Sequence, residues 1–203
     1  GDNGPAFTAA ITTIAPESKI VWLQSSSIDP PDHFSFEEII LTAPTYEVDE
    51  AFDRIQPDTI AKVLFTSGST GQPKGVINTH QNITTNWQQI TQVFPFMTEG
   101  FELIDWLPWN HTFGGNHNVG IAVYNGGTLY LDDGKPTPQG IAETLRNLRE
   151  IAPTIYFNVP KGLEEIARAM DHDPALRDRL FSRVRCFMFA GAGLSQAVWD
   201  HLD

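Results

Sequence analysis

Short apolar runs alternate along the chain with longer segments in which apolar residues recur at helical spacing. The apolar runs predict strands at residues 61–65, 76–77, 103–107, 128–131, 154–159 and 185–190. The segments that predict helices lie at residues 82–94, 116–124, 137–151, 162–170 and 175–180, and a last helix follows Ser195. Strands that alternate with helices predict an α/β fold, a layered αβα arrangement with a largely parallel sheet.

Several helix ends are marked by single residues. Thr137 followed by Pro138 predicts a helix start, because a hydroxyl suits the N-cap and proline suits the first helical position. Pro95 predicts the end of the helix before it. A short helix at residues 35–40 lies inside residues 25–57, whose Pro, Asp, Glu and Ser content predicts a surface connection.

Composition and charge exclude several classes of function. The 203 residues hold 13 Lys plus Arg against 25 Asp plus Glu, a formal net charge of −12, so we expect no nucleic-acid partner. Cys186 is the only cysteine, which excludes an internal disulfide and a thiolate zinc site and favours the reducing cytoplasm. Residues 75–98 and 106–131 carry no charge, but they are rich in amide side chains, His, Thr and Gly, so we expect no membrane span. The first residues lack a basic segment followed by an apolar run, so we expect no signal peptide.

The most informative segment is a loop between two predicted strands. Residues 66–75 read Thr-Ser-Gly-Ser-Thr-Gly-Gln-Pro-Lys-Gly. Glycines let backbone N–H groups approach an anion, and Lys74 supplies a cation. The loop is not of the Walker type, because Pro73 replaces the second glycine and Gly75 replaces the Ser or Thr that would hold Mg²⁺. From composition alone, two interpretations of this segment are nearly equally supported: a phosphate-binding loop and a flexible, hydroxyl-rich turn between two strands.

The order of these ten residues resembles the phosphate-binding loop of the adenylate-forming superfamily. This superfamily includes acyl-CoA synthetases, luciferases and the adenylation domains of peptide synthetases. The resemblance implies that the chain uses ATP and Mg²⁺, that Lys74 is a catalytic residue and that Thr66 is the metal ligand. The nucleotide-binding residues that it implies in this loop are Thr66, Ser67, Gly68, Ser69, Thr70, Gly71 and Lys74.

A second motif, residues 107–114, reads Leu-Pro-Trp-Asn-His-Thr-Phe-Gly. His111 and His117 are six residues apart with no nearby carboxylate, so zinc is not favoured, and from the residues alone a partly buried structural histidine is the simpler interpretation. The order Leu-Pro-x-x-His-x-x-Gly, however, resembles the substrate-gating motif of the same superfamily. The resemblance implies that His111 is catalytic, near the carboxylate or phosphate, and that Phe113 and His117 bind the substrate.

A third motif, residues 189–195, reads Phe-Ala-Gly-Ala-Gly-Leu-Ser. Small residues after a strand allow a flat ligand to lie against the backbone, although a plain turn explains them equally well. The comparable turn of the superfamily borders adenine and the acyl group. This implies nucleotide binding by Gly191 and Ala192, and substrate binding by Gly191. Gly193 stands where many relatives have proline, so we expect the turn to differ locally.

The string from residue 106 to residue 136 looks specifically like bacterial feruloyl-CoA synthetases. That resemblance implies an acid–thiol ligase that converts an aryl carboxylic acid such as ferulate to acyl-AMP and then to a coenzyme A thioester. A fatty-acyl-CoA ligase or another adenylating ligase stays open, as does a non-catalytic nucleotide-binding module. The triplets at Asn82 and Asn110 fit the glycosylation pattern and leave a secreted protein as a further alternative.

The resemblance covers residues 61–202 and implies that residues 1–203 are part of an AMP-binding N-terminal domain. The superfamily's Mg²⁺-binding Glu, its ribose-binding Asp and its C-terminal lid domain with a catalytic Lys have no counterpart up to Asp203. We therefore expect the 203-residue chain on its own to be inactive. The sequence does not indicate the oligomeric state.

Overall fold

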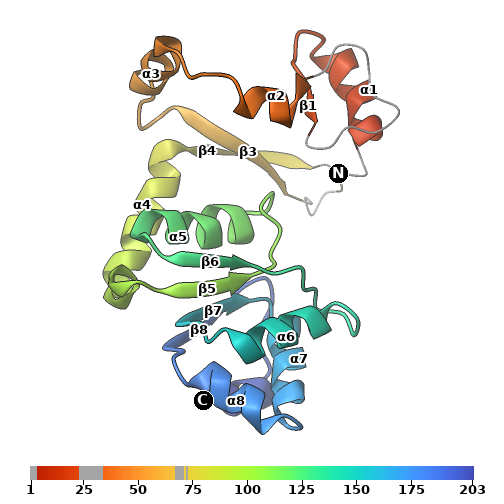
Figure 1. The fold of residues 1–203 in the computed structure, drawn as a ribbon, viewed down its shortest axis with the longest axis vertical. Coiled ribbons are helices and arrows are strands. Elements are labelled where there is room, and N and C mark those ends of the chain that lie inside the picture. Colours follow the sequence, from red (N-terminus) through yellow and green to blue (C-terminus); the bar gives the residue numbers. More distant parts are fainter. Residues whose placement is uncertain (1–3, 23–33, 67–70, 72) are drawn as a thin grey trace. The chain divides into compact units, whose positions relative to one another are not determined.

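The computed structural model describes residues 4–22, 34–66, 71 and 73–203, which divide into two compact units, residues 1–55 and 56–203 (Figure 1). The first unit has three helices and one parallel pair of short strands: α1 (Gly4–Ile14), β1 (Val21–Trp22), β2 (Phe34–Ser35), α2 (Phe36–Ile40) and α3 (Tyr46–Asp53). Ser35 caps α2, since its hydroxyl accepts a hydrogen bond from Glu38 N and the Glu38 carboxylate accepts one from Ser35 N. None of the described side chains of this unit is buried.

Four parallel strands form the centre of the second unit. They are β5 (Glu102–Asp105), β6 (Thr128–Leu131), β7 (Ile155–Asn158) and β8 (Cys186–Phe189). β5 pairs with β6 and β7 pairs with β8, both in parallel. β5 and β7 lie side by side (Figure 1), where Thr154 N, just before β7, donates to Glu102 O at 3.0 Å. The two parallel pairs therefore lie next to each other in the order β6–β5–β7–β8, without a ladder of hydrogen bonds between β5 and β7, and the predicted, largely parallel arrangement is confirmed.

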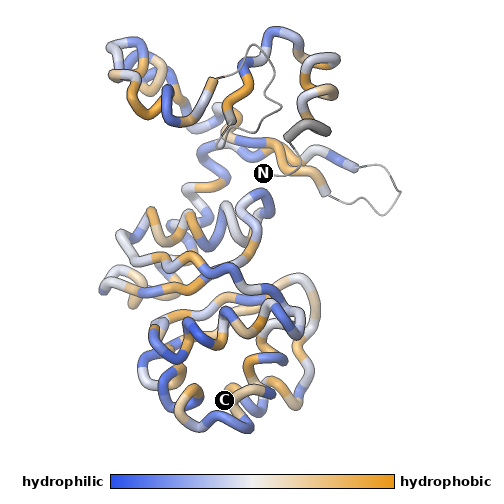
Figure 2. The backbone as a smooth tube through the Cα atoms, turned by 45° about the vertical axis from the view of Figure 1, so that its right-hand side comes forward, coloured by the Kyte–Doolittle hydropathy of each residue, from blue (hydrophilic) through white to orange (hydrophobic). Residues whose placement is uncertain are grey.

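Helices cover both faces of these strands. They are α4 (His80–Val93) and α5 (Gly120–Asn125) on one face, and α6 (Ile141–Glu150), α7 (Pro160–Met170), α8 (Pro174–Phe181) and α9 (Gln196–Leu202) on the other. Successive residues of a strand point to opposite faces. Leu103 packs in the cluster with α5, whereas Ile104 packs in the cluster with α6, α7 and α8. Figure 2 shows hydrophobic and hydrophilic stretches alternating along the backbone. The two clusters on opposite faces of the strands confirm the predicted αβα layering.

An antiparallel hairpin precedes the parallel strands in the chain. It consists of β3 (Ile60–Thr66) and β4 (Lys74–Thr79), with Thr66 opposite Lys74. α4 starts directly after β4, and Thr79 is its N-cap: the Thr79 hydroxyl accepts from Asn82 N, and Asn82 Oδ1 accepts from Thr79 N. The hairpin is thus joined to a helix of the layered unit without an intervening loop.

The regular part of one predicted helix starts later than expected, although its predicted cap is present. α6 begins at Ile141 and not at Pro138. The Thr137 hydroxyl accepts from Gly140 N at 3.1 Å, and its carbonyl oxygen accepts from Ile141 N at 2.9 Å. These are the two bonds that an N-cap residue makes, so Thr137 acts as the predicted cap of a first helical turn, and α6 continues that turn from Ile141.

The predicted buried helix at residues 116–124 is also wrong in its bounds and type. A π-helical segment, η2 (Thr112–Val119), starts earlier and continues into α5. Gly114 allows this early start, because a Cβ at that position would lie 2.5 Å from the Pro108 carbonyl oxygen. α4 ends before Pro95 as predicted, and a 3₁₀ turn, η1 (Pro95–Glu99), follows it.

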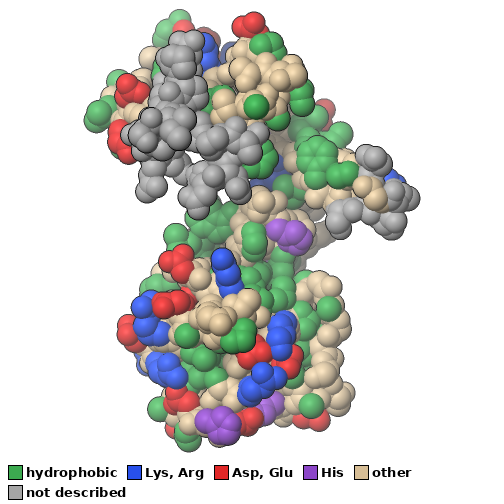
Figure 3. All heavy atoms as spheres, turned by 90° about the vertical axis from the view of Figure 1, so that its right-hand side faces the viewer, with side chains coloured by type: hydrophobic (Ala, Val, Ile, Leu, Met, Phe, Trp, Pro, Cys, Tyr) green, Lys and Arg blue, Asp and Glu red, His purple; other side chains and the backbone are tan. Residues whose placement is uncertain are grey.

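The surface over the helices α6, α7 and α8 is of mixed charge. On the face shown in Figure 3, acidic and basic side chains are interspersed over this part of the molecule. Ion pairs of these helices include Arg149–Asp173 at 2.8 Å and Arg168–Glu164 at 2.7 Å, and surface pairs of this kind add little stability. No helix within the described ranges has the length and apolar character needed to cross a bilayer.

Candidate active site

The candidate site is a cavity of about 960 Å³ along the carboxyl ends of the parallel strands. Trp106 follows β5 directly, Val159 follows β7 and Ala190 follows β8, while Pro136 lies five residues beyond the end of β6; all four line the cavity. In parallel α/β proteins the loops at this edge hold the ligand, because they converge there from every strand. The position of the cavity alone therefore marks it as a ligand site.

The remaining walls come from the hairpin, from α4 and from η2. Phe65 of β3 lies one residue before the glycine-rich loop, and Gly191 belongs to the turn after β8. The second motif and η2 contribute His111, Phe113 and His117. Residues of the second and third motifs therefore line one cavity, together with Phe65, the residue that directly precedes the first motif.

A second cavity, of about 520 Å³, adjoins the start of the loop that carries the first motif. Its lining includes Thr66 of β3, Asn78 of β4 and His111. His111 thus lines both cavities and connects Thr66 with the site at the strand ends. Asn116 Nδ2 donates to Asn78 Oδ1 at 3.1 Å, which fixes η2 against the hairpin.

The predicted loop residues are only partly within the described residues. Ser67, Gly68, Ser69 and Thr70 lie outside them. Thr66 and Lys74 are exposed and face each other in the strand register, with the Thr66 hydroxyl donating to the Lys74 carbonyl oxygen at 3.5 Å. Gly71 has a φ of +80°, which a residue with a side chain rarely adopts.

Of the two residues predicted to bind the nucleotide in the third motif, Gly191 lines the cavity and Ala192 does not. Gly191 has a φ of +97°, so glycine is required for the turn that ends β8. Ala192 is exposed and is not among the residues that line the cavity. Ala190, which the sequence did not single out, takes that place instead.

His111 has a fixed orientation at the start of η2. Its Nδ1 accepts a hydrogen bond from Phe113 N at 3.2 Å, so Nε2 carries the proton when the ring is neutral. A neutral His111 therefore offers an N–H donor. The described part of the chain contains no group of three or more His, Cys, Asp or Glu side chains that could together hold a metal ion.

An aromatic group lies next to His111. The rings of Phe113 and His117 are 5.4 Å apart, and His117 packs edge-on against Phe157 at 4.7 Å. Burial lowers the pKa of His117, while the adjacent Asn118 amide raises it; burial is the larger effect. His117 is therefore a neutral imidazole among aromatic rings at neutral pH.

Two buried carboxylates beneath the cavity were missed by the sequence analysis. Asp105 ends β5, and Asp132 follows the neighbouring strand β6. The pKa of Asp105 is raised to about 6, chiefly by burial and to a smaller extent by the charge of Asp132, while hydrogen bonds, the one from Leu107 N foremost, limit the rise. Asp132 accepts from the buried Thr144 hydroxyl at 2.5 Å. A charged residue placed directly after an apolar strand was the available signal for both.

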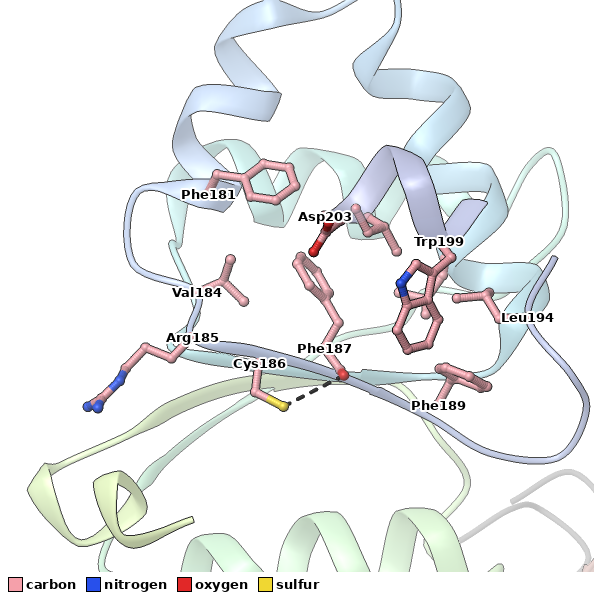
Figure 4. Close-up of a pocket in the computed structure, with 11 residues that line it drawn as sticks. Phe181, Val184, Arg185, Cys186, Phe187, Phe189, Leu194, Trp199 and Asp203 are labelled. Carbon is pink, nitrogen blue, oxygen red and sulfur yellow. Dashed lines mark hydrogen bonds between the residues drawn. The ribbon is translucent and has the colours of Figure 1, made fainter. Parts of the chain in front are cut away.

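A third cavity, of about 330 Å³, lies on the other face of β8. Figure 4 shows Phe187 and Phe189 reaching from β8 toward Trp199 of α9, and the Phe189 and Trp199 rings are 6.1 Å apart. This cavity is lined mainly by apolar side chains, and of the motif residues it contains only Phe189 and Leu194, for which no ligand contact was predicted. We therefore assign the site to the larger cavity at the strand ends.

The fold and cavity define a parallel α/β protein with a ligand site at the carboxyl edge of its sheet. Residues 9–203 match the family model described as AMP-binding enzyme, and the chain belongs to this family.

Curated relatives of known name fit this assignment. A long-chain-fatty-acid–CoA ligase of Gallus gallus, ACSBG2, is 30% identical over 149 residues, which are 69% of this chain and 19% of the relative. The peroxisomal long chain acyl-CoA synthetase 6 of Arabidopsis thaliana is 28% identical over 155 residues, which are 72% and 21% of the two chains. The chain thus spans about a fifth of the length of these relatives.

Solved structures share the fold. A malonyl-CoA ligase in a ternary product complex with methylmalonyl-CoA and AMP has a TM-score of 0.71 at 21% identity, over 96% of this chain and 40% of that one. The complex of VinN with L-aspartate has a TM-score of 0.69 at 21% identity, over 98% of this chain and 50% of that one.

Proposed function

We propose that the chain is part of the large N-terminal domain of an acid–thiol ligase that activates a carboxylic acid with ATP and transfers it to coenzyme A. The observation that supports this proposal is the meeting of three motifs at one pair of adjoining cavities, with His111 in both. A volume near 960 Å³ is at the upper end of ordinary ligand pockets and leaves room for an adenylate with its acyl group.

The proposed reaction has two steps. A carboxylate oxygen attacks the α-phosphorus of ATP, the bond to the departing pyrophosphate breaks, and acyl-AMP forms. The thiol of coenzyme A then attacks the acyl carbon, loses its proton and displaces AMP. Negative charge builds on pyrophosphate in the first step, so cations and N–H donors placed there accelerate it.

The chain's own residues have separate roles in this proposal. Lys74, with its exposed ammonium at the far end of the loop, balances the charge of the outer phosphates. His111 donates from Nε2 to the carboxylate or phosphate, and Phe113 forms a wall of the acyl site. The Thr66 hydroxyl lies at the cavity beside His111 and suits a Mg²⁺ ion that is held mainly by phosphate oxygens. Such an ion would neutralise phosphate charge.

For the substrate we propose an aryl carboxylic acid such as ferulate. The cavity lining contains Phe65, Trp106 and Phe113, which offer flat apolar surfaces to an aryl ring. A long-chain fatty acid is the second candidate, since named relatives are long-chain-fatty-acid–CoA ligases. The single cysteine supports a cytoplasmic location as part of the same proposal.

The test is a substrate panel on the full-length protein that contains this chain. Pyrophosphate release and thioester formation are measured with ferulate, decanoate and malonate at equal concentration. Higher kcat/KM with ferulate supports the aryl-CoA ligase, and higher kcat/KM with decanoate supports the fatty-acyl ligase. Absence of pyrophosphate release with every acid, while ATP still binds, would instead favour a non-catalytic nucleotide-binding module.

A further inference from the structure

His117 presents one unused ring nitrogen to the cavity. Its Nδ1 lies 2.8 Å from Asn118 Oδ1, and Nε2 has no partner among the described residues. The buried side-chain polar atoms that lack a partner in the described ranges are Asp105 Oδ2, Trp106 Nε1, Asn116 Oδ1 and Asn118 Nδ2. His117 Nε2 is not among these buried atoms, so it is accessible. Because His117 lines the cavity, we infer that Nε2 faces the cavity.

The neighbours of His117 determine which proton it carries. Asn118 is fully buried, and its amide lies close enough to the Asp105 carboxylate to lower the pKa of that group, although the two do not meet the geometry of a full hydrogen bond. An ionised carboxylate only accepts, so the Asn118 NH₂ group faces it. The Asn118 carbonyl oxygen then faces His117 and accepts from Nδ1–H, which leaves the lone pair of the neutral ring on Nε2.

Aromatic side chains surround this acceptor. Phe113 and Phe157 pack against the His117 ring, and Phe65 and Trp106 belong to the same cavity lining. An aryl ring bound among these groups would place its substituents near Nε2. A hydroxyl substituent would give Nε2 the hydrogen-bond donor that no described residue supplies.

We propose that His117 Nε2 accepts a hydrogen bond from a hydroxyl group on the acyl part of the substrate, and that the site thereby selects hydroxylated aryl acids. This inference rests on the proposed ligase function and names its substrate class. Asn118 and Asp105 are positioning residues, which hold the tautomer that makes Nε2 an acceptor. A substrate without the hydroxyl leaves this acceptor desolvated and unpaired, which is the basis of strong discrimination.

The experiment compares matched substrates with the full-length protein. Adenylation is followed by pyrophosphate release with 3- and 4-hydroxycinnamate, each against the methylcinnamate of the same substitution, which replaces the hydroxyl by a group of similar size. We expect the wild type to prefer the hydroxylated acid of at least one pair by about 10- to 100-fold in kcat/KM. This ratio is taken within one enzyme preparation, so the amount of folded protein cancels.

Variants then assign the preference to His117. His117→Leu should reduce the hydroxyl-to-methyl ratio of kcat/KM, measured within one preparation, to near 1, whatever the absolute rate. His117→Gln keeps an acceptor oxygen and should retain part of the ratio. His172→Leu, at an exposed histidine between α7 and α8, is the matched control and should keep the wild-type ratio.

Two results would overturn the inference alone: a wild-type ratio near 1 for both pairs, or an unchanged ratio in His117→Leu. In both cases acyl-AMP still forms and the ligase function stands. Pyrophosphate release with none of the acids would instead contradict the proposed function, and the inference would fall with it.

Discussion

Thr66 and Lys74 face each other across the β3–β4 ladder, and the Thr66 hydroxyl lies 3.5 Å from the Lys74 carbonyl oxygen. The two strands thereby bring together both ends of the loop that carries the first motif. Thr66 also shares a cavity with His111, and His111 shares another with Gly191. The hairpin register therefore places the start and end of the loop beside the second motif.

Lys74→Ala should impair adenylation in the full-length protein. Loss of the ammonium removes a cation from the developing pyrophosphate charge, so we expect kcat/KM for ATP to fall about 10²- to 10³-fold. Lys62→Ala is the matched control, because Lys62 lies on β3 outside the lining of both cavities at the site. Equal rates in wild type and Lys74→Ala, with unchanged folding, would refute the catalytic role of this lysine.

Gly114→Ala should destabilise the fold at the start of η2. A Cβ at residue 114 would lie 2.5 Å from the backbone oxygen of Pro108, so the backbone must shift. We expect the free energy of unfolding to fall by about 1–3 kcal/mol in urea titrations of the full-length protein. Gly193→Ala is the control, since a Cβ there meets nothing within 4 Å. Equal midpoints for the two variants would contradict the close packing at Gly114.

The Asp105 carboxyl should make stability depend on pH. Its pKa is raised to about 6 in the folded protein, chiefly by burial, against about 3.9 in an unfolded chain. The folded state therefore binds more protons between pH 4 and pH 6, and its contribution to stability, fully present below pH 4, is lost as the pH rises through 6.

Asp105→Asn removes that dependence. Relative to wild type, its unfolding free energy should rise by about 2–3 kcal/mol between pH 4 and pH 7, as measured by denaturant unfolding across this range. Asp133→Asn, which replaces an exposed carboxylate, is the control and should leave the profile parallel to that of wild type. A constant difference between Asp105→Asn and wild type across the range would show that the carboxyl is not buried as described.

Thr144→Val should measure the cost of leaving one buried carboxylate oxygen, Asp132 Oδ2, without the hydrogen bond from Thr144, while Oδ1 keeps those from Gly134 N and Asn147 Nδ2. The buried Thr144 hydroxyl donates to Asp132 Oδ2, and valine removes the donor with little change in shape. We expect a loss of about 1–3 kcal/mol in the free energy of unfolding. Thr84→Val is the control, because it breaks only an exposed bond to the His80 carbonyl oxygen. Comparable losses in both variants would argue against a special role for the buried pair.

The layered core was predictable from the sequence, because the strands that form it are short apolar runs. β6 matches its predicted range, Thr128–Leu131, in full, and Ser195 caps α9 as expected. The first unit was less predictable. α3 has no buried residue and no side-chain cap, so neither a core face nor a capping signal marked it in the sequence.

The sequence singled out cavity-lining residues that belong to a motif, but it did not reveal features that depend on tertiary contacts. His111, Phe113, His117 and Gly191, which the motifs singled out, line one cavity, and their catalytic and binding roles stay predictions. The buried Asp105 was missed, because its burial depends on the neighbouring elements and not on its own segment. The start of η2 was missed for the same reason, since it depends on contact between Gly114 and a carbonyl oxygen of the preceding turn.

The most direct test of the central claim is a crystal structure of the full-length protein with a non-hydrolysable ATP analogue. We predict that the outer phosphates lie in the loop of residues 66–75, within hydrogen-bonding distance of the Thr66 hydroxyl and the Lys74 ammonium, with the acyl cavity beside His111. Triphosphate density at another place in the protein, away from Thr66 and Lys74, would contradict the account.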